Sequence, residues 1–499
     1  AQLRELSTMA WEKSYMKSVM RRFNYMSELK QVIGSNQGHV AATTACIANM
    51  AGYAFLNLPK EQAIAAVEDY MNQLIDIFGE ENLFVEISPS LCPGQIEYNK
   101  FMYEKYKDTL PFVITNDAHY LTKDDFRTLE LLMGENREIE KYYKYAYFME
   151  WEEIVKNLNY LPLEFVEGAA QNALDFAATT DIYKLKNPQE IPIVPHDEYK
   201  PQETLLKEAR TYEFIAKFLD SEHESDRNMA LQAIARFGEK EETTTDRRKL
   251  VFNRLNDEWQ ELWGISETLN TRLSNYLLTM SWMIEKMWET GTLVGPGRGS
   301  AVAFATNYYL DITDVNPLDY PLNIPHWRFI SSSRVELPDI DIDTPGADRQ
   351  LVLNKLTEEF QALGGDVVQV ATYGTATTKS ALRSIGRGLG IPGETMDYIT
   401  SLVPSERGQQ FSLHQTYYGD DDHPPVKDFV EQMEENPELW EHAQKVEGLI
   451  VQMGVHAGGV ILSNQPIHHH NSVMRTKQGV RVTAYNLQES EDTGLIKYD

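Results

Sequence analysis

Two apolar runs flank a helical pattern in the first part of the chain. The runs are residues 82–90 (NLFVEISPS) and 111–121 (PFVITNDAHYL), and both have the length and apolar content of buried strands. Residues 99–109 (NKFMYEKYKDT), between them, have the pattern of a helix. A strand, a helix and a second strand in this order predict a βαβ unit, so residues 1–190 are expected to form an α/β domain.

Beyond this region the pattern changes several times. Residues 186–202 are rich in proline and polar side chains and predict a linker, whereas residues 203–290 predict helices. Residues 291–372 predict strands and loops with short helices, residues 374–450 predict helices again, and residues 451–499 predict strands. Because 499 residues are too many for one ordinary domain, we expect about two to four.

Composition narrows the class of protein. Hydrophobic residues make up 42% of the chain and charged residues 24%, as in ordinary soluble globular proteins. We expect no membrane span and no secretory leader. The chain has two cysteines, Cys46 and Cys92, which lie far apart in the sequence. They indicate a reducing cytosol and no disulfide framework.

The formal net charge of −29 argues against a surface covered with phosphate-binding cations. Acidic residues are concentrated in patches at 221–226, 418–423 and 431–441, which are typical of solvated helix faces or loops. Binding of a nucleic acid needs only a local cluster of lysine and arginine, so this class of function stays open.

The segment ELPDIDIDTP places three aspartates, Asp339, Asp341 and Asp343, at alternate positions with Ile340 and Ile342 between them. In an extended strand the aspartates would share one face and the isoleucines would face a core. Carboxylates at such a short separation repel one another, so either open water or a divalent cation must offset the free-energy cost of this repulsion. The pattern therefore predicts a solvated edge strand or a metal site.

A glycine-rich turn, VGPGRGS, precedes the acidic segment. Its glycines at 295, 297 and 299 allow backbone conformations that side chains disfavour, and Ser300 opens a helical stretch. A turn of this kind that leads into a helix presents free N–H groups to a phosphate, and Arg298 adds a planar set of donors. The turn lacks the Walker A and Rossmann spacings, so a purely structural turn is the alternative.

A phosphate-binding turn followed by paired carboxylates indicates metal-assisted phosphoryl transfer. Two divalent ions about 3.5–4 Å apart can stabilise the attacking and leaving oxygens of an in-line displacement. Magnesium prefers carboxylate, water and phosphate oxygens, so few protein ligands are needed.

A basic stripe lies further along the chain. Lys379, Arg383 and Arg387 recur every four residues on one side of a predicted helix, next to an apolar stripe formed by Leu382, Ile385 and Leu389. Such a stripe can follow a nucleic-acid backbone, or it can simply be a solvated basic face.

Three weaker signals involve histidines. Residues 451–463 (VQMGVHAGGVILS) predict a strand, a glycine turn and a second strand, in which His456 either contacts a ligand or belongs to a structural turn. The run HHH at 468–470 predicts a surface segment. Asp117 and His119 share one face at the end of a predicted strand, and Asp-x-His is a metal-ligand spacing, although a structural role is the alternative.

These motifs, in this order, resemble the alpha subunit of bacterial DNA polymerase III, the C-family of replicative polymerases. The segments that carry the resemblance are VGPGRGSAVAF, RFISSSRVELPDIDID, VATYGTATTKSALRSIGRGLGIP, GVHAGGVILS and GLIKYD. PFVITNDAHYLTKDDF is similar to the polymerase-and-histidinol-phosphatase (PHP) domain of that family.

The resemblance implies a multidomain α/β and α+β protein. Its parts would be a PHP-like α/β domain (1–195, truncated at its N-terminus), a nucleotidyltransferase palm of the polymerase-beta type (196–370 and 454–499) and a helical thumb (371–453). The implied activity is template-directed DNA synthesis, in which a nucleotide passes from a dNTP to the 3′-hydroxyl of a primer.

The resemblance also implies roles for individual residues. The two magnesium ions of the palm would be held by Asp339, Asp341 and Asp499, with Asp343 outside this set. The incoming nucleotide would be bound by Arg298, Gly299, Ser300, Arg328 and Lys497, with Arg349 as a weaker candidate. Primer–template DNA would be bound by Lys379, Arg383, Arg387 and His456.

The sequence departs from the family pattern in the PHP region. The His-rich opening motif is absent, and Leu129 stands where the family often has histidine, which leaves Asp117 and His119 as a remnant. We therefore expect a mainly structural domain in which a PHP metal is doubtful. A PHP-type phosphoesterase or 3′–5′ exonuclease, and a non-catalytic DNA-binding scaffold, remain the alternative functions.

The chain lacks the fingers region that follows the palm in the family. We expect a second polypeptide, or a missing part of the same one, to supply fingers and C-terminal domains, and a sliding clamp to bind through it. The expected location is the cytoplasm of a bacterial or bacteriophage-infected cell, with no membrane partner.

Overall fold

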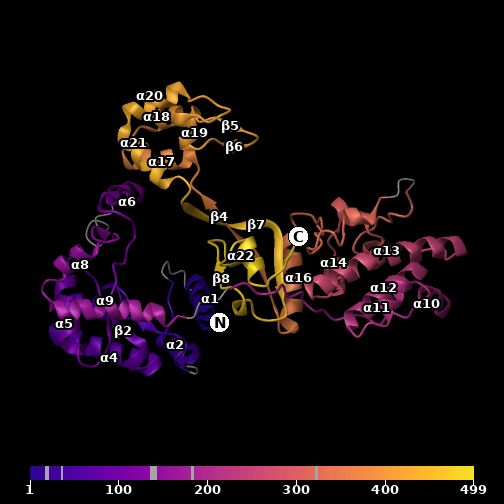
Figure 1. The fold of residues 1–499 in the computed structure, drawn as a ribbon, viewed down its shortest axis with the longest axis horizontal. Helices are drawn as coiled ribbons and strands as arrows, with labels where there is room; N and C mark the ends of the chain where they lie inside the picture. The colour runs from indigo at the N-terminus through magenta and orange to yellow at the C-terminus, as the bar shows by residue number, and fades with distance from the viewer. Residues whose placement is uncertain (17–21, 35–36, 135–142, 181–184, 321–323) are drawn as a thin grey trace.

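The computed structural model describes residues 1–16, 22–34, 37–134, 143–180, 185–320 and 324–499. Figure 1 shows three parts. We call residues 22–180 the N-terminal unit, residues 376–449 the helical unit, and residues 185–375 with 450–499 the central unit.

The N-terminal unit contains a parallel three-stranded sheet in the order β1-β2-β3. The strands are β1 (Ala42–Thr43), β2 (Leu83–Ile87) and β3 (Phe112–Ile114). The helices around it are α2 (Met26–Val32), α3 (Met50–Asn57), α4 (Lys60–Phe78), α5 (Gln95–Tyr106), α6 (Phe126–Met133), α8 (Trp151–Asn157) and α9 (Leu163–Ala178). Because α5 connects β2 to the parallel strand β3, the predicted βαβ unit is confirmed, although β3 is much shorter than residues 111–121.

Apolar spacing explains why these helices pack where they do. In α4, buried Val67, Met71, Leu74 and Phe78 recur every three or four residues and form one face against the sheet. Each such side chain contributes roughly 1.5–3 kcal/mol when it leaves water. The polar residues of α4 lie on the opposite, solvated face.

The central unit begins with five helices, as predicted for residues 203–290. They are α10 (Glu203–Ala209), α11 (Glu213–Leu219), α12 (Glu224–Lys240), α13 (Thr245–Leu269) and α14 (Leu273–Glu289). Thr244 caps the start of α13 by accepting a hydrogen bond from the backbone N–H of Arg247, and Asn270 ends the helix in a left-handed conformation (φ 51°).

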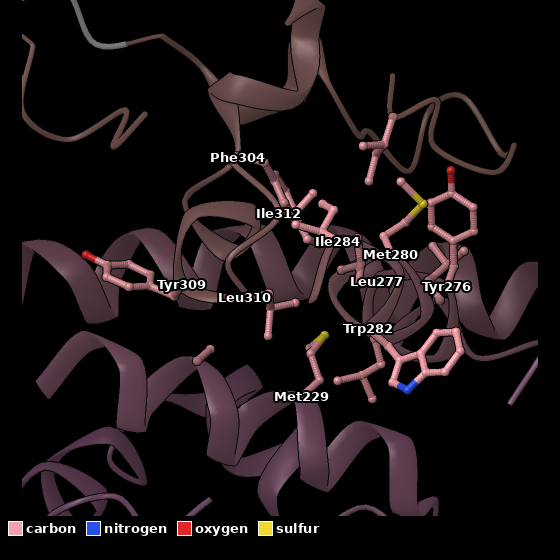
Figure 2. Packing of buried hydrophobic residues seen from close by; sticks show 14 of the residues in the cluster. Met229, Tyr276, Leu277, Met280, Trp282, Ile284, Phe304, Tyr309, Leu310 and Ile312 are labelled. Carbon is pink, nitrogen blue, oxygen red and sulfur yellow. The ribbon is translucent and has the colours of Figure 1, made fainter. Parts of the chain in front are cut away.

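The largest hydrophobic core lies between these helices and the residues that follow the glycine turn. Figure 2 shows Leu277, Met280 and Ile284 of α14 directed toward Phe304 and Ile312, with Met229 of α12 and Leu310 nearby. This packing fixes the segment that carries the glycine turn.

A mixed five-stranded sheet in the order β10-β7-β4-β9-β8 completes the central unit. Its strands are β4 (Asp366–Thr375), β7 (Ile450–Ser463), β8 (Val473–Arg475), β9 (Arg481–Thr483) and β10 (Lys497–Tyr498). The predicted strand, turn and strand at 451–463 is wrong, because β7 is one strand that pairs along the whole of β4 with register shifts. Glycines within β7 therefore do not form a turn.

Other local predictions need correction. Residues 291–372 include the 14-residue helix α16 (Arg349–Ala362), and the acidic segment 339–343 is not a strand. The HHH run enters a short 3₁₀ helix, η6 (Ile467–His469), and His470 is buried instead of lying at the surface.

The helical unit contains α17 (Thr378–Gly388), α18 (Gly393–Ser401), α19 (Leu413–Tyr418), α20 (Lys427–Glu435) and α21 (Pro437–Val446). It also has a two-stranded hairpin, β5 (Ser405–Glu406) and β6 (Gln409–Gln410), that the sequence did not predict. Strands β4 and β7 run as a ribbon from the central unit to the helical unit (Figure 1).

Two segments pack on elements of the central unit that lie far from them in the sequence. Helix α1 (Gln2–Met16) packs on β8 of the central unit, where Glu12 forms ion pairs with both Arg475 and Arg481. Residues 185–202 form an extended strap on the central unit, held by backbone hydrogen bonds such as Asn187 N–H to Asp492 O (2.8 Å). Within the described ranges, no helix has the length and apolar character needed to cross a membrane.

Candidate active site

Three carboxylates meet at the end of the central sheet. Asp339, Asp341 and Asp499 each offer an oxygen, and these oxygens lie within 4.8 Å of one another. Asp499 follows β10, the edge strand that pairs with β7. Asp339 and Asp341 lie in the irregular segment before α16, and this segment is aligned by a backbone hydrogen bond from Ile342 N–H to Asp499 O (3.1 Å). The sequence prediction that these residues converge therefore agrees with the geometry.

The alternation of aspartate and isoleucine has the expected effect although the segment is not a regular strand. Ile340 is buried in the large core, and Ile342 is partly buried against it. Asp343 stands outside the trio with an exposed side chain, and its backbone oxygen accepts a hydrogen bond from Gly295 N–H (2.8 Å). This bond joins the acidic segment to the glycine turn.

Two cations form ion pairs with these carboxylates and offset part of their charge. Arg298 Nε lies 3.2 Å from Asp341 Oδ2, and Arg298 Nη1 lies 3.2 Å from Asp343 Oδ1. Lys497 Nζ forms an ion pair with Asp499 Oδ2. Both residues were predicted to contact phosphate, and the structure places both next to the acidic trio.

Burial, followed by the charge of Asp341, raises the pKa of Asp339 above its ordinary value, and Lys497 opposes this shift. The trio also lies near a stacked pair of buried tyrosines, Tyr276 and Tyr498, whose ring centroids are 5.3 Å apart. Burial and the nearby carboxylates, Asp339 above all, raise the pKa of Tyr276. The site therefore has an excess of negative charge that a cation would relieve.

One oxygen of the trio is suited to a metal ion. Asp499 Oδ1 is buried and accepts no hydrogen bond from any residue in the described part of the chain. A buried carboxylate oxygen without a donor costs free energy, whereas a divalent cation would satisfy it. The oxygen-only ligand set of Asp339, Asp341 and Asp499 fits magnesium.

Two glycines of β7 allow Asp499 to approach the sheet. A Cβ atom on Gly458 would lie 2.9 Å from Asp499 Oδ1, and one on Gly459 would lie 2.4 Å from the Lys497 side chain. The sequence interpretation of these glycines as a turn missed this role. His456, a predicted DNA contact, accepts hydrogen bonds from the N–H groups of both glycines at 3.3 and 3.1 Å.

The glycine turn has the unusual backbone that the sequence predicted at two of its positions. Gly297 and Gly299 have φ values of 107° and 63°, and Ser300 is exposed beside them. The following helix differs from the expectation: a short 3₁₀ helix, η4 (Gly299–Ala303), leads into α15 (Ala305–Tyr309), which is only five residues long. The turn and not a long helix must therefore provide any phosphate contact.

A buried ion pair anchors the start of α15, the helix that follows this turn, and sequence reasoning did not find it. Arg254 donates to Glu258 (2.7 Å), and Glu258 accepts hydrogen bonds from the backbone N–H groups of Ala305 and Thr306 (2.7 and 2.9 Å). In sequence the pair has the i, i+4 spacing of a surface salt bridge, but Glu258 is fully buried.

A cavity of about 420 Å³ adjoins the trio. Its lining combines polar residues, among them Arg298, Asp341, Arg349 and Asp499, with apolar side chains of α14 and α16. Arg349 donates to Gln369 Oε1 (2.6 Å) and to Gly458 O (3.1 Å), so it braces the sheet beside the cavity. Arg328, on the 3₁₀ helix η5 (His326–Arg328), is exposed and is not part of this lining.

The predicted DNA-binding stripe lies on α17. Lys379 is half-buried, and Arg387 is exposed. Arg383 donates to Asp397 Oδ1 (2.9 Å) and Thr400 Oγ1 (3.1 Å) of α18, so its charge is partly committed within the helical unit.

Asp117 and His119 lie in the loop after β3. Asp117 has a positive φ of 47°, and His119 Nδ1 lies 2.7 Å from the Asp117 carbonyl oxygen, a contact within the loop. Nearby Glu86, which sequence reasoning missed, is buried and accepts hydrogen bonds from Thr43 and Thr115. Among the described residues, no group of three potential metal ligands forms at this edge of the sheet.

Comparison with known proteins agrees with this geometry. The family described as "Bacterial DNA polymerase III alpha NTPase domain" matches residues 229–499. "Probable DNA polymerase YorL" of Bacillus subtilis is 33% identical over 524 aligned positions, and "DNA-directed DNA polymerase" of Bacillus phage SPbeta has the same identity. In both, the alignment covers 100% of this chain and 40% of the relative.

The similarity extends to cellular replicases. "DNA polymerase III subunit alpha" of Aquifex aeolicus is 27% identical over 531 aligned positions, with 100% of this chain and 42% of the relative covered. The chain thus spans about two fifths of the length of these relatives. The matched region contains the glycine turn and all three carboxylates of the trio. This chain belongs to the bacterial DNA polymerase III alpha family, the C-family of DNA polymerases.

Proposed function

We propose that this chain is the palm and thumb portion of a template-directed DNA polymerase, which transfers a nucleotide from a dNTP to the 3′-hydroxyl of a primer. The convergence of Asp339, Asp341 and Asp499 within 4.8 Å is the observation that carries the proposal. In this proposal residues 196–370 and 454–499 form the palm, residues 371–453 the thumb, and residues 1–195 a PHP-like domain.

The three carboxylates would hold two magnesium ions. When bound, these ions would lower the pKa of the primer hydroxyl and neutralise charge on the leaving pyrophosphate. The partnerless Oδ1 of Asp499 and the raised pKa of Asp339 support a site that is incomplete without a cation.

The cations next to the trio would bind the triphosphate. The Arg298 side chain is more than half exposed and flexible, so its guanidinium group can turn from Asp341 toward a phosphate. Lys497 would do the same from Asp499. Gly299 and Ser300 would present the turn to the nucleotide, and the adjoining cavity leaves space for part of it. Arg328 would contact the nucleotide only after a movement of η5.

Primer–template DNA would lie against the helical unit, with Lys379, Arg383 and Arg387 facing its backbone. Because Arg383 is paired with Asp397, we propose that it contributes less than the other two. His456 is committed to Gly458 and Gly459, so its part would be to hold β7 beside the DNA. A fingers region, present in the same or a second polypeptide, would complete the nucleotide site, and a sliding clamp would bind through the regions beyond the palm.

Primer extension with Mg²⁺ tests the proposal, first with this chain and then with the remaining part of the polymerase added. Asp341→Asn is expected to lower extension by at least about a thousandfold, since one ligand of the ions is lost. Asp220→Asn, an exposed aspartate in the α11–α12 connection, is the matched control.

Thermal unfolding with Mn²⁺ gives a second measurement that does not need catalysis. The wild-type chain should unfold at a higher temperature when Mn²⁺ is present, and Asp341→Asn should lose most of this shift. Extension that survives in Asp341→Asn, or a wild-type chain that neither extends a primer nor responds to Mn²⁺, would overturn the proposed function.

The PHP-type phosphoesterase is not supported by a specific observation. Asp117 and His119 contact each other within one loop, and Glu86 is occupied by two threonine hydroxyls.

A further inference from the structure

The β5–β6 hairpin presents an arginine at its tip in a conformation that arginine rarely adopts. Ser405 pairs with Gln410 and Glu406 with Gln409, so the loop between the strands has two residues, Arg407 and Gly408. Their φ values are 51° and 84°. Two successive positive φ values characterise a tight hairpin turn, whose first position usually holds asparagine, aspartate or glycine.

Arginine at this position costs free energy that nothing in the local packing offsets. The left-handed conformation disfavours a residue with a long side chain by about 1–2 kcal/mol. The Arg407 side chain is 90% exposed, and its contact with Glu406 is a long ion pair of 3.9 Å. A strained residue that does not stabilise its own turn points to a role outside the chain.

The hairpin is firmly attached to the start of α17, the helix that carries the basic stripe. Thr378 Oγ1 donates to Phe411 O at 2.6 Å, directly after β6. The backbone N–H of Lys379 donates to Gln410 Oε1 at 3.3 Å. The tip arginine and the stripe are therefore parts of one rigid surface.

Glu406, the acidic residue next to Arg407, also has a partner at the base of the hairpin. Glu406 Oε2 lies 3.4 Å from His423 Nε2, and the ring of His423 packs on Phe411 at the base of the hairpin. In the view of Figure 1 the hairpin projects from the helical unit toward the side of the molecule where Asp499 lies. Arg407 is thus an exposed cation at the tip of this hairpin.

We infer that Arg407 contacts the phosphate backbone of duplex primer–template DNA, and that the β5–β6 hairpin extends the DNA-binding surface of α17. This inference rests on the proposed polymerase function. Contacts to phosphates position a duplex without regard to its sequence, as a polymerase requires. The tight turn fixes the backbone of Arg407 before DNA arrives, which lowers the entropy lost on binding.

Binding of a fluorescently labelled DNA duplex to the 499-residue chain, measured by anisotropy at several salt concentrations, tests this. Arg407→Asn keeps a residue that tolerates positive φ and removes the charge. It should weaken binding on the order of threefold to tenfold and reduce the slope of log Kd against log salt by about one. Arg407→Lys should restore most of the slope, because it restores the charge.

Arg210→Ala, which removes an exposed arginine from the end of α10, is the charge-matched control and should leave binding unchanged. An unfolding temperature of Arg407→Asn equal to or above that of wild type verifies that the turn persists, because asparagine adopts a positive φ more readily than arginine. Wild-type affinity and salt slope in Arg407→Asn would overturn the inference while the proposed function stands. Failure of the wild-type chain to bind the duplex would overturn the DNA contacts proposed for the thumb and this inference with them.

Discussion

Arg298 Nε lies 3.2 Å from Asp341 Oδ2, so the arginine of the glycine turn is an ion-pair partner of the carboxylate trio. The same side chain reaches Asp343. A cation that pairs with the trio competes with a metal ion for the carboxylates. The same cation must leave the trio before it can bind a phosphate. Under the proposed function, the pair would link metal binding to nucleotide binding.

Arg298→Gln should bind Mn²⁺ about twofold to fivefold more tightly than wild type in the absence of dNTP. Arg298 is exposed, and an exposed ion pair contributes little, so the expected gain in affinity is small. Titration of Mn²⁺ followed by electron paramagnetic resonance measures the effect. The KM for dNTP of the completed polymerase should rise in the same variant. Arg334→Gln removes an arginine that pairs with Glu336, outside the trio, and serves as the control; unchanged Mn²⁺ affinity in Arg298→Gln would contradict the competition.

Asp339→Asn should raise the stability of the metal-free chain at neutral pH. The folded pKa of Asp339 lies above the unfolded value, so between these two pKa values the folded state keeps a proton that the unfolded state has lost. Stability is therefore lost as the pH rises through the unfolded pKa of about 3.8 toward the folded pKa. Asparagine cannot ionise and avoids this loss.

The unfolding temperatures of Asp339→Asn and wild type, compared from pH 4 to pH 8, measure this gain. The difference should be largest at neutral pH and shrink toward pH 4. Mg²⁺ should reverse the order, because only wild type keeps all three ligands. Asp343→Asn, which loses an ion pair with Arg298, should show no gain; a constant difference at all pH values would argue against the electrostatic cause.

Gly458→Ala should reduce kcat of the completed polymerase on the order of a hundredfold with little change in unfolding temperature. The new Cβ atom would lie 2.9 Å from Asp499 Oδ1, and that oxygen can move because it ends a side chain. A shift of about 1 Å at a metal ligand costs catalysis more than stability. Gly374→Ala in the neighbouring strand β4, where the nearest atom is 3.6 Å away, is the control. Equal kcat in the two variants would show that the approach of Asp499 to Gly458 is not required.

Thr128→Val should destabilise the contact between the N-terminal and helical units. Thr128 Oγ1 and His442 Nδ1 lie 2.8 Å apart in a buried contact between α6 and α21. Valine has a similar shape but leaves the ring nitrogen without this partner, at a cost of about 1–3 kcal/mol. Chemical denaturation measures the loss, and exposed Thr180→Val is the comparison. A difference below about 0.3 kcal/mol between the two variants would mean that water replaces the threonine.

The contact between α6 and α21 also indicates a structural role for the segment around Leu129. Arg127 of α6 pairs with Glu438 of α21, and Asp125, directly before α6, pairs with Lys445 of α21 (2.9 Å each). We propose that this segment supports the helical unit and not a metal centre. Its sequence offered no signal of this, because the partners lie more than 300 residues apart.

Local sequence was sufficient for much of the fold. The apolar spacing of α4, the βαβ unit from β2 to β3 and the helices of residues 203–290 follow from periodicity, since each depends on contacts of near neighbours. Strand β7 was misjudged because glycine usually ends a strand. Here Gly458 and Gly459 lie in an irregular stretch of one strand, between Val455, which pairs with Ala371, and Val460, which pairs with Gln369, and no local pattern contains this pairing.

The residue types of the site were also determined by the sequence: alternating aspartates, a glycine turn with an arginine, and the terminal lysine and aspartate of KYD. Only the tertiary structure decided that Asp499 meets Asp339 and Asp341, that Gly458 makes room for it, that Arg298 pairs with the acids, and that Glu258 anchors α15, the helix after the turn, from inside the core. The physical reason is range: side-chain chemistry and helix periodicity are encoded within a few neighbouring residues, whereas charge pairing and close packing depend on segments that chain folding brings together.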